Sequence, residues 1–93
     1  MLNLKNLHSK NPFYADLTVH YGAKGYHPSE QDQSGHMMYV INGGSRVLVM
    51  TDQPVERIMD FTTDPHTFAD MVWCETSTGH RVQLPAQHLK KAK

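Results

Sequence analysis

The sequence predicts a single, small, mainly antiparallel β-domain. Its 93 residues are enough for one domain and too few for two. Short runs rich in β-branched and aromatic residues recur along the chain, and clusters of Gly, Pro, Asn and Ser separate them. The composition, 39% hydrophobic and 19% charged, is that of a folded chain rather than a disordered one.

The first 35 residues predict an arm, a strand and a loop. Residues 1–12 form a short N-terminal arm that the Asn11-Pro12 pair ends. Phe13–Tyr21 is the first predicted strand, because the apolar Leu17 and Val19 alternate with polar residues. Residues 22–35 are rich in Gly, Pro, Ser and Gln, which predicts a long polar surface loop.

A β-hairpin is predicted in the middle of the chain. His36–Ile41 and Arg46–Thr51 are β-prone runs, and Asn42-Gly43-Gly44 between them is a turn signal because Asn and Gly tolerate positive φ. Both runs carry apolar residues on both strand faces. We therefore expect the hairpin to be covered on both sides or to lie in the middle of a small barrel.

The segment Val55–Phe61 fits a strand or a helix by periodicity. We favour the strand, because the segment is short and Thr62 and Thr63 continue it. Asp64-Pro65-His66 is predicted to be a turn.

The last third of the chain predicts a second hairpin and a closing turn. Met71–Thr76 and His80–Leu84 are the strands, joined at Ser77-Thr78-Gly79. Pro85–Leu89 suits one 3₁₀ turn, with Pro at its start, that returns Leu89 to the core. Residues 90–93 are predicted to be a solvated basic tail.

Three short motifs carry a resemblance. Gly43-Gly44 precedes the apolar run Val47–Met50, Trp73-Cys74 lies in a later strand, and Pro85–Leu89 closes the chain. This half resembles small bacterial domains of the YodC-like type, which are SH3-like barrels. The resemblance implies a partly open SH3-like barrel. The stretch Asp52–Asp70 departs from the family pattern, and the family has no defined activity to transfer.

The run Val82-Gln83-Leu84-Pro85 is similar to the end of the type II dihydrofolate reductases, which are also SH3-like. Those enzymes carry a Val-Gln-Ile-Tyr run in a pore made by four chains. The Tyr is missing here, because Pro85 follows Leu84 directly. An oligomeric pore enzyme is therefore a distant alternative.

No catalytic, cofactor-binding or metal-binding residues are predicted. The chain is rich in histidine, but its seven histidines lack the spacing of a metal site on a helix or strand. Cys74 lies beside Trp73 in an apolar strand, which predicts a buried, inert thiol and a core tryptophan. The phosphate-binding, dinucleotide-binding and nucleophile-elbow motifs are absent.

Charge is balanced overall and uneven along the chain. Nine Lys and Arg offset nine Asp and Glu. Residues 52–75 contain six acidic and one basic residue, a net of −5, and residues 76–93 contain four basic residues and no acidic one, a net of +4. This dipolar pattern favours oriented docking to a partner. The single Cys excludes an internal disulfide, and the absence of a signal peptide or membrane span predicts a cytoplasmic protein.

These observations predict a non-catalytic protein-binding module that docks on a larger host protein. Such a module would be an accessory or inhibitory protein of the kind that phages and mobile elements encode. Self-association into a homo-oligomer is a further expectation, because so small a core is thin. The candidate partner-binding residues are Lys24, Tyr26, His27, Asp60, Asp64 and His66.

The alternative is a small-barrel nucleic-acid-binding protein, against which the zero net charge argues. Its candidate contact residues are Lys24, Tyr26, Arg46, Arg81, Lys90 and Lys91.

Overall fold

The computed structural model describes residues 2, 11–30, 37–60 and 63–92. Within these ranges the chain forms eight strands and one 3₁₀ turn, which confirms the predicted mainly β class. In chain order they are β1 (Phe13–Leu17), β2 (Tyr21–Tyr26), β3 (Met37–Ile41), β4 (Arg46–Val49), β5 (Glu56–Asp60), β6 (Thr67–Glu75), β7 (Arg81–Pro85), the turn η1 (Ala86–His88) and β8 (Leu89–Lys91).

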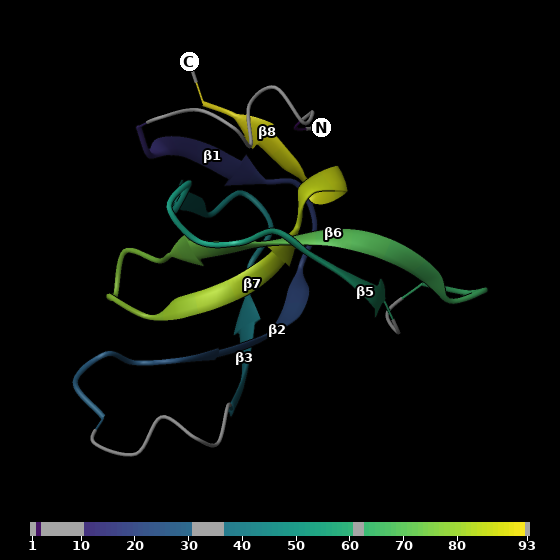
Figure 1. Cartoon of the computed structure of the whole chain (residues 1–93), viewed down its shortest axis with the longest axis horizontal. Helices are drawn as coiled ribbons and strands as arrows, with labels where there is room; N and C mark the ends of the chain where they lie inside the picture. Colours follow the sequence, from purple (N-terminus) through teal and green to yellow (C-terminus); the bar gives the residue numbers. More distant parts are fainter. Residues whose placement is uncertain (1, 3–10, 31–36, 61–62, 93) are drawn as a thin grey trace.

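The strands form one antiparallel sheet in the order β3-β2-β7-β6-β4-β1-β8, and β5 pairs with β6 outside this path. Figure 1 shows β8 beside β1 at one end of the sheet, β3 beside β2 at the other, and β6 and β7 crossing the middle. The sheet is not closed into a barrel, because β3 and β8 are its two ends.

The core draws small and branched side chains from almost every strand. Leu17, Val47, Val49, Val82, Leu84 and Leu89 are among its most deeply buried residues. The burial of Leu89 confirms that the closing turn returns this side chain to the core. Burial of such side chains stabilises the fold by about 1.5–3 kcal/mol each.

The predicted strand Phe13–Tyr21 is wrong as a single element. Residues 18–20 are not in a strand, so the segment is divided between the end of β1 and the start of β2. Thr18 donates from its backbone N and its Oγ1 to the carbonyl of His88, at 2.9 and 3.0 Å. These bonds to a segment far along the chain satisfy groups that a continuous strand would use in its ladder. β1 therefore pairs with β4 and β8, while β2 pairs with β3 and β7.

The predicted loop over residues 22–35 is corrected at its start, because residues 22–26 belong to β2, and residues 31–36 lie outside the described residues. Burial alternates along β2, with Tyr21, Ala23 and Gly25 buried. A Cβ at Gly25 would meet the carbonyl oxygen of Arg81, so glycine permits β7 to approach closely. Gly25, one of the glycines that indicated a loop, is here a packing residue of an interior strand.

The predicted hairpin of the middle segment is also wrong, although both strands and the turn exist. Ser45 donates to the carbonyl of Asn42 at 3.1 Å, and Gly44 has a φ of +90°. The turn is tied to the end of β1, because the Gly44 N donates to the Leu17 carbonyl at 2.6 Å. β4 pairs with β1 and β6, whereas β3 pairs with β2 and with no other described strand. β3 is thus an exposed end of the sheet rather than a covered central strand.

The predictions for the last third hold, with two corrections, of which the first is that β6 begins at Thr67 rather than at Met71. Strand β5 confirms the strand interpretation of its segment, and β6 and β7 form the predicted hairpin. The 3₁₀ turn follows Pro85 as predicted. The tail is corrected, because Leu89–Lys91 pairs with β1 as strand β8.

The predicted N-terminal arm, residues 1–12, lies almost wholly outside the described residues. Of its described members, Leu2 is buried, and its backbone N donates to the carbonyl of Ala86 at 3.3 Å.

Candidate functional site

One face of the central strands gathers aromatic and basic side chains. The register places Tyr26 beside Arg81 and Trp73 beside Gln83. The rings of Tyr26 and Trp73 meet edge to face with centroids 5.7 Å apart, and both residues are half-buried. Lys24, two residues before Tyr26, shares this side of β2, because side chains alternate along a strand. We call Lys24, Tyr26, Trp73 and Arg81 the Tyr26–Trp73 face.

A methionine-lined groove adjoins this face. It has a volume of about 200 Å³ and is mainly apolar, with Met38, Met59 and Met71 in its walls and Lys24 at its edge. Gln83 also lines the groove, and its Nε2 donates to Oε1 of Glu56 at 3.1 Å. Flexible thioether side chains let such a surface adapt to the shape of a partner.

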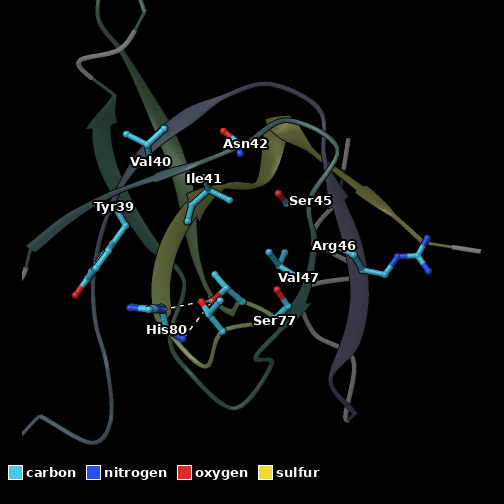
Figure 2. Close-up of a pocket in the computed structure, with 11 residues that line it drawn as sticks. Tyr39, Val40, Ile41, Asn42, Ser45, Arg46, Val47, Ser77 and His80 are labelled. Carbon is cyan, nitrogen blue, oxygen red and sulfur yellow. Dashed lines mark hydrogen bonds between the residues drawn. The ribbon is translucent and has the colours of Figure 1, made fainter.

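A second concave region, the mouth pocket, lies where β3 and β4 diverge and has a volume of about 450 Å³. Figure 2 shows β3, the turn after it, the start of β4 and the β6–β7 turn around the pocket, with Ile41 and Val47 pointing into it. Thr78 Oγ1 lies 2.7 Å from Nδ1 of His80, and the His80 ring packs against Tyr39 with centroids 4.7 Å apart. The pocket therefore combines apolar walls with a hydroxyl-bearing rim.

Arg46 lines the mouth pocket, and its guanidinium is ion-paired with Asp16. Its Nε donates to Oδ1 of Asp16 at 2.9 Å, and Nη2 donates to Oδ2 at 3.3 Å. The hydrogen bond from the Arg46 guanidinium holds the pKa of Asp16 below its usual value. The mouth pocket therefore offers neutral rather than charged groups.

Two histidines that are far apart in the sequence come together beside the mouth pocket. The rings of His27 and His80 are 5.0 Å apart between centroids. Nδ1 of His27 accepts a hydrogen bond from the Ser29 backbone N at 3.2 Å, so the neutral ring carries its proton on Nε2. Within the described ranges, no three His, Cys, Asp or Glu side chains gather as a metal site would require.

The structure separates the six predicted partner-binding residues. Lys24 and Tyr26 lie on the Tyr26–Trp73 face, and His27 follows them against His80. Asp64 and His66 are exposed between β5 and β6.

Asp60, which the sequence placed among the exposed contact residues, is buried, with 2% of its surface exposed. It accepts a hydrogen bond from the Tyr21 hydroxyl. Asp60 is thus corrected to a core residue, because a buried carboxyl cannot meet a partner.

The residues predicted for nucleic-acid binding fall into two groups. Lys24, Tyr26 and Arg81 are neighbours on β2 and β7. Arg46, Lys90 and Lys91 lie on β4 and β8, which flank β1. Arg46 is paired with Asp16, and Lys91 Nζ lies 5.2 Å from the centroid of the Phe13 ring. The basic residues therefore do not form one continuous strip.

Trp73 is the site residue that sequence reasoning missed. It was predicted to be core because it stands in an apolar run, yet it is half-buried beside Tyr26. The run of residues 71–74 is apolar throughout, so no alternation in the sequence marked Trp73, and only the structure shows that Val72 and Cys74 are more deeply buried on the opposite side of β6. Cys74 is buried as predicted, and burial raises the pKa of its thiol to about 12.

No protein-family model, no curated protein and no solved structure matches this chain. Within the described part of the chain, no helix has the length and hydropathy needed to cross a membrane. Over the described residues, the fold is that of a small antiparallel β-domain whose sheet is not closed into a barrel.

Proposed function

We propose that this chain is a non-catalytic protein-binding module that docks on a larger protein through the Tyr26–Trp73 face. The observation that carries the proposal is the edge-to-face contact of Tyr26 and Trp73, flanked by Arg81 and Lys24. Tyr, Trp and Arg are the residue types that dominate binding energy at protein interfaces.

The neighbouring surface supports the same function. The methionine groove continues from Lys24 toward β5, so an aromatic anchor and an adaptable apolar groove lie side by side. Protein interfaces are enriched in Met as well as in aromatic residues and Arg. The partner that fits is a protein segment with apolar side chains for the groove and an acidic group for Lys24.

The strands that carry this face are rigidly supported. β2 and β7 lie inside the sheet, and Gly25 lets them approach closely. A face of this kind loses little conformational freedom on binding, which favours affinity.

Site-specific photo-crosslinking tests the proposal. A benzophenone amino acid replaces Tyr26 in one variant and the exposed Gln87 in the control. We expect the crosslinker at position 26 to form a covalent adduct with a partner protein, and the yield of this adduct to reach saturation. The crosslinker at position 87 should form no such adduct. Adding Lys24→Glu should reduce binding by about tenfold, equivalent to about 1.4 kcal/mol, because it reverses an exposed charge at the edge of the contact.

Three results would count against the proposal. Equal adducts from both positions would show non-specific contact. An adduct from position 26 that Lys24→Glu leaves unchanged would remove Lys24 from the site. An adduct that nuclease destroys, together with binding that falls steeply as salt rises, would instead support the nucleic-acid alternative.

A further inference from the structure

We propose that two copies of this chain pair through the free edge of β3, antiparallel and around a two-fold axis at Tyr39. This inference does not rest on the proposed function, because it concerns the free edge of β3, although Met38 contributes both to the methionine groove and to this edge.

The three strand edges of the sheet differ in a way that singles out β3. β8 carries the exposed Lys90 and Lys91, and β5 carries the exposed Glu56 and Arg57. Charged residues of this kind are how natural proteins prevent edge-to-edge pairing. The sequence of β3, Met-Met-Tyr-Val-Ile, contains no charge and no proline. Among the described strands, none pairs with its edge away from β2, and the strand itself carries no charge that would oppose pairing there.

Three apolar side chains of β3 are largely exposed to solvent, and contact with a partner would bury them. Met37, Met38 and Val40 are 59%, 69% and 77% exposed. Of the three, Val40 and Met38 stand on one side of the strand, because side chains alternate. A strand laid along β3 would shelter both.

A second copy of β3 is self-complementary in one register. With Tyr39 opposite Tyr39 of the second copy, Met38 lies opposite Val40 of the second copy, and the two-fold axis repeats the same contact. Directly opposite side chains have Cβ atoms about 4.5–5.5 Å apart, close enough for apolar contact. No like charges face each other across the pair.

In the same register, the Met37 side chain of the second copy would enter the mouth pocket. Tyr39 and Ile41 line that pocket from the other side of β3, as Figure 2 shows. Met37 of the second copy would lie opposite Ile41 and reach the apolar wall that Ile41 and Val47 form. Met37 is exposed on a single chain, so pairing would shelter it as well.

The dimer is expected to be weak, because one pair of five-residue strands buries less than the roughly 1,200–2,000 Å² of a standard interface. Sedimentation equilibrium over a range of concentrations tests it. The average mass should rise from 10.6 kDa toward twice that value. Val40→Lys should hold the mass at one chain throughout, whereas Phe68→Lys, at a 56% exposed residue of β6, should behave as the unaltered chain.

A monomer at every concentration would overturn the proposal. So would a Val40→Lys variant, folded by circular dichroism, that associates as the unaltered chain does. Association that Phe68→Lys abolishes would place the contact elsewhere.

Cysteine substitution tests the register. Tyr39→Cys should form a disulfide-linked dimer under oxidation, because opposite Cα atoms lie about 4.5–5.5 Å apart. Met38→Cys should not, because two such residues would be diagonal neighbours about 7–8 Å apart, beyond the usual reach of a disulfide. The native Cys74 is buried and does not compete. A reversed pattern would contradict the two-fold axis at Tyr39.

Discussion

The hydroxyl of Tyr21 donates a hydrogen bond to Oδ1 of Asp60 at 3.2 Å inside the protein. Tyr21 is the first residue of β2 and Asp60 is the last residue of β5, and the two strands are not paired with each other. β5 lies outside the main path of the sheet, so this bond ties an outlying strand to the central ones. It also explains why Asp60 belongs to the fold rather than to a contact surface.

Replacing Tyr21 by Phe is expected to destabilise the protein by about 1–3 kcal/mol, because it removes a donor from a buried carboxyl. Urea denaturation followed by tryptophan fluorescence measures the change. Tyr14→Phe is the matched control, since the Tyr14 side chain is exposed, and it should shift the free energy of unfolding by less than about 0.5 kcal/mol. If both substitutions changed the free energy of unfolding equally, the hydrogen bond between Tyr21 and Asp60 would not contribute to stability.

Two glycines of β2 should respond in opposite ways to alanine. A Cβ at Gly25 would meet the Arg81 carbonyl oxygen and would lie 2.7 Å from Cγ1 of Val82. Gly25→Ala is therefore expected to cost about 3 kcal/mol or more, or to prevent folding. At Gly22 the nearest atom is Cε of Met38 at 3.9 Å, so Gly22→Ala should be neutral or stabilising by about 0.5–1 kcal/mol. Thermal unfolding distinguishes the two, and a well-folded Gly25→Ala variant would show that β2 and β7 lie further apart.

The ion pair of Asp16 and Arg46 should make part of the stability depend on pH. Arg46 lowers the pKa of Asp16 in the folded protein. A carboxyl with a lowered folded pKa contributes stability above its unfolded pKa, about 3.9, and loses it as pH falls through the folded value. Asp16→Asn should therefore lower the free energy of unfolding slightly at pH 7 and leave it unchanged near pH 2.

Urea unfolding at both pH values measures this difference, with Asp52→Asn, an exposed residue after β4, as the control. An effect of Asp16→Asn that persists at pH 2 would point to packing rather than charge.

The Cys74 thiol should resist alkylation in the folded protein. Burial raises its pKa to about 12, so little thiolate forms at pH 8, and reagents cannot reach the sulfur. Iodoacetamide labelling followed by mass spectrometry should be slow in buffer and fast in guanidinium chloride.

A Gln87→Cys variant supplies the internal comparison, since position 87 is exposed and lies outside both proposed contact surfaces, and it should gain one label rapidly in buffer. Rapid labelling of the unaltered chain under the same conditions would show that β6 opens readily.

Local sequence patterns were sufficient to predict those elements that pack against segments adjacent to them in the chain. The β6–β7 hairpin, the 3₁₀ turn after Pro85 and the return of Leu89 were predicted for this reason. The buried, inert Cys74 was predicted as well, because its apolar surroundings are adjacent in sequence.

The sequence did not predict which strands pair across long distances. Asn42-Gly43-Gly44 has the chemistry of a hairpin turn, and a turn does form there. The strands on either side of it pair with other strands instead of with each other, and the turn itself is hydrogen-bonded to Leu17, a contact that no local pattern reveals. The same holds for β2, where glycine indicates a loop in sequence and close strand packing in space.

Propensity and turn chemistry act over a few residues, and for that reason the mainly β class, most strand positions and the closing turn could be predicted from the chain. The contact of Tyr26 with Trp73, the burial of Asp60 and the position of β3 at an end of the sheet exist only in the folded protein. Those features depend on strand order, which is set by contacts between distant segments and by the burial they achieve together.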